Sequence, residues 1–388
     1  MGLTLAQAKK MLLLNKDAGN ATLLCSPSGY GKSQGALQAY DELKAANAAI
    51  GKTTGFGMIY AATVTSPDLL GLPWKGTRTV EFADGRPAVT VTVTDPAAPL
   101  WMLDVFTGKP AWAFDDFVLI VEEYGQGTPE AKRSIAELMN TGCLPPHYLP
   151  VGSGRWGLTN SGIRYGVSKD FLFAISRRTL VDIVPDPKGL VDHWELPYKW
   201  HGKTWTVSPL FKAWASSPTG REVVFQEPDA KKDDPWCNPR TALAADRFRQ
   251  VYEKSIGRTP KADDDFVLTH FTGTIGHSAT ASICEYIQFE SELPKLAEVV
   301  ADPLNAPLHK RGDLQLLMAF KLAGETEEQH LGPVIQYVDR LDADYSPTFM
   351  KSFLKRAPKG IIVNPHIQAW TARNKAVLNM IAAMMQDK

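Results

Sequence analysis

The sequence predicts an α/β fold in its first half, a parallel sheet covered by helices, followed by an all-helical region. Short apolar runs alternate with helix-like segments, as in a sheet whose strands are joined by crossover helices. These runs are continuously apolar, which is typical of strands buried on both faces. Helical patterns dominate from Thr241 onward. The five expected strands lie in 21–25, 56–64, 117–123, 156–161 and 180–185.

The length of 388 residues is more than one compact domain usually holds. We expect the sheet domain over 1–205 and a helical domain over 206–388, with a linker or loop at 225–240. One segment interrupts the alternation of strands and helices. Alternating valines flank Asp84-Gly85, which predicts a β-hairpin at about 78–94. This insertion is either a plain surface hairpin or an element that faces a partner.

Helix signals are strongest in the segment TPEAKRSIAELMNTG. Thr128 can cap this helix, Pro129 suits its first turn and Gly142 its end. One face is apolar and is expected to pack on the sheet. It is formed by Ala131, Ile135, Leu138 and Met139.

Charge and cysteine usage exclude several classes of function. Lysine plus arginine and aspartate plus glutamate number 42 each, so the net charge does not favour binding to nucleic acid or anionic membrane. No apolar run approaches the ~18 residues that span a bilayer. The four cysteines form no CxxC pair, and a disulfide framework or zinc site is not expected. We expect a soluble, cytoplasmic protein.

The segment CSPSGYGKSQG matches a phosphate-binding loop except at its first position, where Ser26 replaces glycine. It lies between an expected strand and an expected helix, which is the required context. In such a loop, backbone amides and a helix N-terminus surround the phosphates. Lys32 would reach the β- and γ-phosphates, and Ser33 would ligate Mg²⁺. The alternative is a chance Gly-Lys-Ser turn, which the flanking strand and helix disfavour.

Acidic residues end the third expected strand, FVLIVEE. Hydrolytic P-loop enzymes need one acid that helps to hold Mg²⁺ and another that polarises the attacking water. Glu122 is the candidate for the metal and Glu123 for the catalytic base. Exposed acids at a strand end are common, but here they follow a matching phosphate loop.

Three weaker signals come later in the chain. Asn160 closes the fourth expected strand, where its amide could hold water or contact the γ-phosphate, although asparagine at such a place is often only a turn residue. Arg177 and Arg178 precede the fifth strand, and one of them could be an arginine finger rather than part of a surface pair. Arg240 opens the first helix of the all-helical region and could contact the γ-phosphate from there.

The order of these motifs resembles that of AAA+ ATPases of the MoxR type, in particular versions common in bacterial and phage genomes. The resemblance covers most of 20–250, through the phosphate loop, LLGLPW, VEEYGQGTPEAKRSIAELMNTG, LTNSG, SRRTLVDIVPD and NPRT. Two positions depart from the family pattern, Ser26 for glycine and Glu122 for aspartate.

The resemblance implies a P-loop AAA+ αβα sandwich with a five-stranded parallel sheet, a helical lid and a ring, usually hexameric, with ATP between subunits. Glu123, Arg177 and Asn160 would then be catalytic, with Arg177 preferred over Arg178 on spacing. Ser33 and Glu122 would hold Mg²⁺. The expected nucleotide contacts are Ser28, Gly29, Tyr30, Gly31, Lys32, Ser33, Gln34 and Arg240.

Members of this family act as chaperone-like remodellers, often with a partner that carries a von Willebrand factor A domain. By that resemblance, Trp74 is either a contact for a protein substrate or a buried core residue. Two other functions stay open: an ATP-binding oligomeric scaffold with little turnover, and a phage nucleic-acid motor.

Overall fold

The computed structural model describes residues 2–162, 166–170, 172–227, 234–358 and 360–374. Its contacts divide the chain into two compact units, Met1–Pro185 and Asp186–Lys388. This division lies before the boundary expected at 205, so the residues between the two positions belong to the second unit. The last part of the helical pattern near the C-terminus, 375–388, lies outside the described residues.

The fold class predicted from the sequence is confirmed in the first unit. A five-stranded parallel sheet has the order β2-β5-β8-β1-β9. Its strands are β1 (Ala21–Ser26), β2 (Thr54–Tyr60), β5 (Asp116–Glu122), β8 (Gly154–Asn160) and β9 (Arg178–Asp182). The carboxyl ends of parallel strands meet at one edge, which brings the end of β5 and the end of β8 to the same side as the end of β1.

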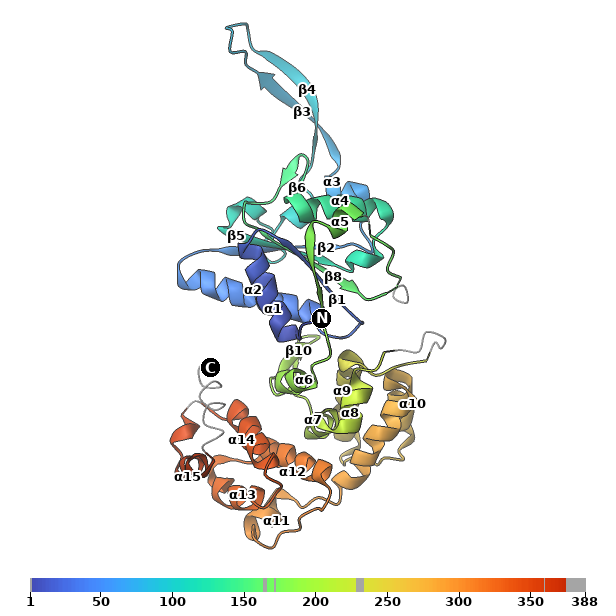
Figure 1. The fold of residues 1–388 in the computed structure, drawn as a ribbon, viewed down its shortest axis with the longest axis vertical. Helices are drawn as coiled ribbons and strands as arrows, with labels where there is room; N and C mark the ends of the chain where they lie inside the picture. The colour runs from blue at the N-terminus through green and yellow to red at the C-terminus, as the bar shows by residue number, and fades with distance from the viewer. Residues whose placement is uncertain (1, 163–165, 171, 228–233, 359, 375–388) are drawn as a thin grey trace. The chain divides into compact units, whose positions relative to one another are not determined.

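Helices cover both faces of this sheet, as Figure 1 shows. On one face, α1 (Leu5–Asp17) and α2 (Lys32–Ala49) pack on side chains of β1, β5, β8 and β9. On the other, α3 (Ser66–Leu70) and α4 (Pro129–Thr141) pack on β1, β2 and β5. Thr128 caps α4 by accepting from Ala131 N, and Gly142 ends it with φ 70°. The expected helix signals are therefore confirmed.

The first unit also contains several smaller elements. They are η1 (Leu100–Met102), η2 (Ala111–Ala113), η3 (Tyr124–Gln126), β6 (Cys143–Leu144), β7 (His147–Tyr148) and α5 (Leu172–Ile175).

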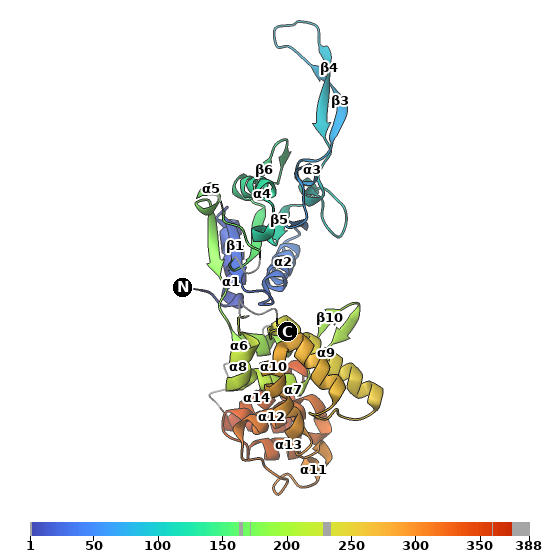
Figure 2. The same cartoon turned by 90° about the vertical axis from the view of Figure 1, so that its right-hand side faces the viewer.

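The predicted hairpin is present and is longer than expected. It is formed by β3 (Pro73–Val80) and β4 (Val89–Pro96), which pair only with each other. Gly85 lies in its turn at φ 80°, a conformation that glycine adopts readily. In both views the hairpin extends away from the sheet (Figures 1 and 2). Trp74 at its base is 74% exposed, so the core alternative for this residue is wrong.

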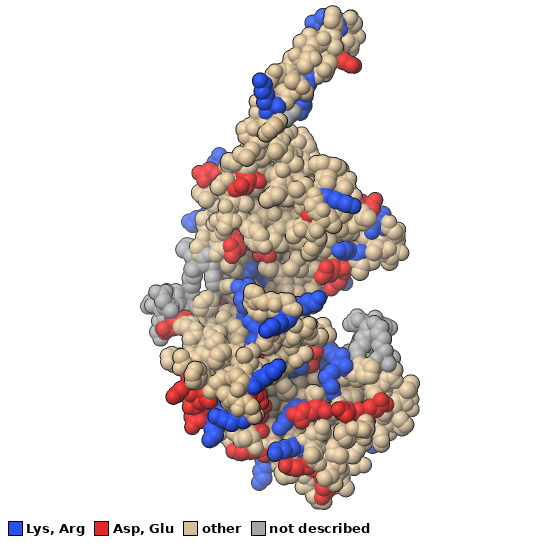
Figure 3. Space-filling view, turned by 180° about the vertical axis from the view of Figure 1, so that it is seen from behind, with Lys and Arg blue, Asp and Glu red and all other residues tan. Residues whose placement is uncertain are grey.

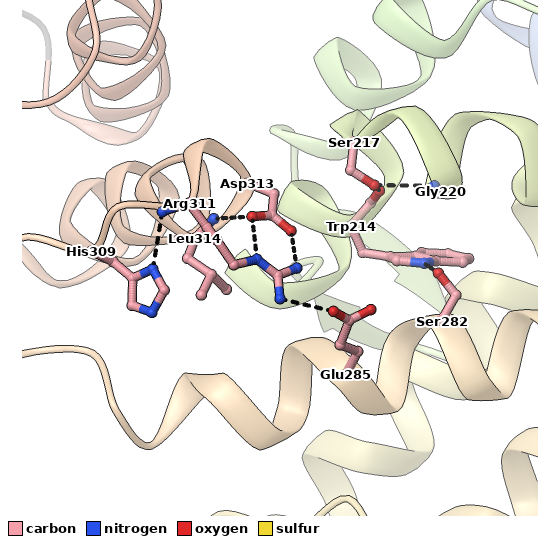
Figure 4. A network of polar contacts seen from close by, with 9 residues as sticks. All are labelled: Trp214, Ser217, Gly220, Ser282, Glu285, His309, Arg311, Asp313 and Leu314. Atoms are coloured by element: carbon pink, nitrogen blue, oxygen red, sulfur yellow. Dashed lines mark hydrogen bonds and ion pairs between the residues drawn. The ribbon is translucent and has the colours of Figure 1, made fainter.

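The second unit is helical around one large apolar core. A polar cluster joins two of its long helices (Figure 4): Arg311 donates to Asp313 and to Glu285. Nearby, the buried Trp214 donates from Nε1 to Ser282 at 2.9 Å. The elements of this unit are α6 (Pro187–Trp194), β10 (Tyr198–Trp200), β11 (Lys203–Trp205), α7 (Pro209–Ser216), α8 (Pro218–Val224), α9 (Pro239–Ile256), α10 (Asp265–Glu290), α11 (Leu296–Ala301), α12 (Gly312–Glu325), η5 (Glu328–His330), α13 (Leu331–Val338), α14 (Tyr345–Arg356), η6 (Ile361–Val363) and α15 (Pro365–Arg373).

Two general properties bear on function. In the part of the chain that the structure describes, no helix is both long and apolar enough to cross a membrane. The four cysteines are free thiols.

Candidate nucleotide site at the carboxyl edge of the sheet

The phosphate-loop sequence forms the connection between β1 and α2. Gly29 and Gly31 have φ of 84° and 82°, a left-handed backbone that residues with a side chain rarely adopt. Gly31 also caps α2 without any side-chain hydrogen bond to the first turn of the helix. The first-turn N–H groups of a helix lack partners within the helix, and together with the helix dipole they favour an anion. The loop therefore has the backbone geometry that phosphate binding requires.

Lys32 is buried at the start of α2, with 8% of its surface exposed. Its Nζ lies 3.0 Å from each of four oxygens: Ser26 O, Ser26 Oγ, Pro27 O and Asn160 Oδ1. The ammonium group is thus held at the centre of the loop rather than in solvent. From this place it can donate to phosphate oxygens that enter the loop.

Ser26, the departure from the usual motif, takes part in the hydrogen bonds around Lys32. It is the last residue of β1 and, unlike Gly29 and Gly31, does not have a positive φ. Its hydroxyl donates to Pro27 O at 2.9 Å and accepts from Lys32. A glycine is therefore not needed at this position for backbone reasons, and the serine adds one oxygen around the lysine.

Glu122 and Ser33 meet at the same edge. Ser33 Oγ donates to Glu122 Oε2 at 3.0 Å, although the two residues are 89 positions apart. The glutamate side chain is long enough to reach the serine directly. Hydroxyl and carboxylate oxygens are the donor types that Mg²⁺ takes in proteins, usually together with water and substrate phosphates. The pair fits that ion, whereas no cluster of three or more His, Cys, Asp or Glu residues suited to a metal occurs among the described residues.

Glu123 has a strained backbone. Its φ of 54° and ψ of 35° place it in the left-handed region, one of two such non-glycine residues in the described chain. Such strain costs about 1–3 kcal/mol and is concentrated at functional sites. The turn exposes Glu123 while the next residue, Tyr124, is 1% exposed. The strained turn thus directs one side chain into solvent and the next into the core.

Asn160 is brought beside the loop by strand register. It pairs with Ser26 across β8 and β1, and its Oδ1 accepts from Lys32. The structure therefore brings together Lys32, Ser33, Glu122 and Asn160. Their catalytic and binding roles remain predictions.

The other expected nucleotide contacts of the first unit belong to the loop or follow it directly in the sequence. Tyr30 is buried, Ser28 half-buried and Gln34 exposed. Arg240 lies in the second unit, exposed in the first turn of α9, where its backbone N–H donates to the cap residue Asn238. A lid role for Arg240 remains a prediction.

The two candidate finger arginines differ clearly in exposure and in the closeness of their ion pairs. Arg178 begins β9, is 8% exposed and forms an ion pair with Asp170. Arg177 is 48% exposed, with its Nη1 3.8 Å from Glu137 Oε2. A loose ion pair of this kind between exposed residues contributes little and is easily broken. Arg177 is the one that is placed to reach outward.

Arg177 lies at the opposite edge of the sheet from the phosphate loop. Arg178 pairs with Ala21, the first residue of β1, whereas the loop follows Ser26, the last. Five residues of strand span roughly 16 Å at ~3.3 Å per residue. Arg177 is therefore remote from the phosphate loop of its own chain.

The sequence does not indicate that Lys132, Asp170 and Arg178 form a group of largely buried ionic residues. Lys132 lies on α4 next to its predicted apolar face, and is only 1% exposed. A lysine at that position is a weak signal, because its partner Asp170 is distant in the sequence.

Comparisons with known proteins give likenesses in structure. No family model and no curated protein matches the chain. Among solved structures, it is similar to the ORC2 protein of Aeropyrum pernix, described as ADPNP–ADP complexes, with 12% identity, a TM-score of 0.37 and coverage of 95% of this chain and 94% of that one. It is also similar to NtrX of Brucella abortus in complex with ATP, with 11% identity, a TM-score of 0.35 and coverage of 92% of this chain and 63% of that one.

Proposed function

We propose that this protein is an ATP-hydrolysing AAA+ ring of the MoxR type, which remodels a protein partner. The observation that carries the proposal is the arrangement at the carboxyl edge of the sheet. Lys32 is held inside a glycine-shaped loop and bonded to Asn160, and Ser33 contacts Glu122 beside it. These are the groups that ATP binding and hydrolysis require.

Each group then has a chemical role. The loop amides and Lys32 hold the β- and γ-phosphates, and Ser33 and Glu122 hold Mg²⁺, which neutralises charge on the phosphates when bound. Glu123 takes a proton from the attacking water, and Asn160 orients that water. Glu123 is exposed at the start of the strained turn, so its carboxylate is open to water.

The distance of Arg177 from its own loop supports an oligomer. An arginine at the far edge of the sheet can stabilise transition-state charge only in the site of a neighbouring copy. We therefore propose a homo-oligomeric ring, hexameric as in the family it resembles, in which each site combines two chains. Arg240 would act as a lid contact to the γ-phosphate.

The hairpin supports a protein partner. Trp74 is exposed at its base, and Val80, Val89 and Val91 are 38–48% exposed along it. Apolar side chains on a projecting hairpin are suited to contact with protein. The candidate partner is a protein with a von Willebrand factor A domain, as in the family that the sequence resembles. We place the protein itself in the cytoplasm.

The alternative of a nucleic-acid motor is less well supported. Basic and acidic side chains are interspersed over each unit on the face in Figure 3, and the formal net charge is zero. Nucleic-acid binding is usually marked by a basic patch or stripe.

The proposed activity predicts steady-state phosphate release from ATP and Mg²⁺ by the purified protein, unchanged when DNA or RNA is added. Release at the background rate by protein that still binds ATP would leave only the scaffold function. Clear stimulation by DNA or RNA would instead favour the nucleic-acid motor.

Replacement of Lys32 by alanine is expected to weaken ATP binding on the order of 10- to 100-fold, because charge-assisted hydrogen bonds to the phosphates are lost. The measurement is titration with a fluorescent ATP analogue. Lys16→Ala is the matched control, since Lys16 is similarly buried (9% exposed) but pairs with Asp116 away from the loop. Equal affinity in Lys32→Ala and wild type would contradict the assignment of the loop.

A further inference from the structure

A largely buried group of charged residues lies between the proposed base Glu123 and the proposed finger Arg177. Asp170 joins two cations, Lys132 at 2.5 Å through Oδ1 and Arg178 through Oδ2. The ring of Tyr124 lies against both: Lys132 Nζ is 5.4 Å and Arg178 Cζ is 4.7 Å from its centroid. We call Lys132, Asp170, Arg178 and Tyr124 the ionic cluster.

The ionic cluster is also tied to the backbone of the Glu123 turn. Lys132 Nζ donates to Ser168 O at 2.9 Å and to Ser168 Oγ at 3.1 Å. Ser168 N in turn donates to Gly125 O at 3.0 Å. A Cβ on Gly125 would lie 2.3 Å from Thr159 Oγ1, so the turn is packed too closely for any side chain there. The segment that carries Asp170 is thus seated directly on the turn.

Each end of the ionic cluster adjoins one catalytic candidate. Tyr124 follows Glu123, whose left-handed backbone forms the turn at the carboxyl edge. Arg178 follows Arg177 and begins β9 at the amino edge. The cluster therefore links the two edges of the sheet through side chains from η3, α4 and β9 and through Asp170, which precedes α5.

Such a cluster resists partial rearrangement. Lys132 and Arg178 are 1% and 8% exposed and Asp170 is 17% exposed, so removal of one partner leaves charge buried without compensation. Buried, densely packed groups also shift between discrete arrangements rather than deform continuously. A displacement of Tyr124 at one end is therefore expected to shift Arg178 at the other.

We propose that Lys132, Asp170 and Arg178 are positioning residues that couple the base Glu123 to the finger Arg177. In a ring, Glu123 serves the nucleotide bound by its own chain and Arg177 serves the nucleotide of the neighbour. The ionic cluster thereby links two successive ATP sites through one subunit. This inference rests on the proposed function and adds the route by which one site senses the next.

Subunit mixing tests the coupling. Glu123→Gln lacks the base but supplies fingers, and Arg177→Ala lacks the finger but supplies bases. A mixture of the two should regain ATPase activity at interfaces that combine the intact halves. Asp170→Asn alone should lose on the order of 10- to 100-fold in kcat, as for a small misplacement of catalytic groups, with little change in KM. Mixed with Glu123→Gln or with Arg177→Ala, Asp170→Asn should not regain activity, because both its base Glu123 and its finger Arg177 are misplaced.

The outcomes separate the inference from the function. Activity regained by Asp170→Asn with either single partner, or full activity of Asp170→Asn alone, would overturn the coupling. If Glu123→Gln and Arg177→Ala do not complement each other although each assembles and binds ATP, the shared-site function itself fails, and the coupling with it.

Two further variants exclude a general loss of structure. Asp116→Asn breaks a comparably buried ion pair with Lys16 (2.8 Å) at the amino end of β5 and should keep its kcat. Asp170→Asn is used once its thermal midpoint, assembly and ATP affinity match those of Asp116→Asn. If it does not fold, Tyr124→Leu removes the shared ring while keeping all three charges, and the same mixing outcomes then decide.

Discussion

Replacing Arg177 by alanine is expected to leave ATP binding intact and to reduce turnover on the order of 10³-fold or more, the size of effect that arginine fingers have. The physical reason is that the guanidinium stabilises charge that develops only in the transition state, so its loss appears in kcat. The measurement is steady-state phosphate release at saturating ATP, together with affinity for a fluorescent ATP analogue.

A matched control is available for Arg177. Arg258 is 55% exposed and forms an equally loose ion pair, 3.9 Å from Asp264. Arg258→Ala should therefore turn over ATP at the wild-type rate. Full activity in Arg177→Ala would mean that Arg178 or no arginine acts as the finger. The burial of Arg178 in an ion pair with Asp170 argues against the first of these.

Replacing Glu123 by glutamine is expected to lower kcat by roughly 10²- to 10⁴-fold, because the amide cannot accept the proton of the attacking water. ATP affinity should be retained or increased, since one negative charge near the phosphates is removed. Single-turnover hydrolysis with bound ATP measures the step directly. Wild-type turnover in the variant would exclude Glu123 as the base.

Glu130→Gln is the control for Glu123. Glu130 is likewise exposed and lies seven residues later, in the first turn of α4. It can interact favourably with the helix dipole, which is a stability effect of about 0.3–1 kcal/mol. Its replacement should lower the thermal midpoint slightly and leave kcat unchanged.

The sheet could be predicted from sequence because its strands are buried on both faces. Val118 to Val121 are at most 1% exposed, and only a continuous apolar run satisfies such a position. The phosphate loop was also predictable, since Gly29 and Gly31 meet a local demand for positive φ. Features that depend on the conformation of one short stretch of backbone can therefore be predicted from the residues of that stretch.

Features that depend on distant partners could not be predicted in the same way. The contact between Ser33 and Glu122 shows that the longer acid reaches the serine, which no local pattern indicates. The ionic cluster is similar, because Lys132 meets Asp170 only after α4 folds onto the sheet. The exposure of Trp74 could not be predicted from the sequence, because a short apolar segment fits either a core or a projecting hairpin.

The base of the β3–β4 hairpin is pinned. Ala97 N donates to Leu72 O at 2.9 Å, and a Cβ on Gly71 would lie 1.8 Å from Ala97 O, so both ends of the insertion leave and return at one fixed point. The two strands of the hairpin pair only with each other. The hairpin can therefore be lengthened, shortened or given other side chains without a change in the five-stranded sheet. Substitutions in the hairpin can therefore change the proposed contact with a protein partner while the proposed ATP site keeps its structure.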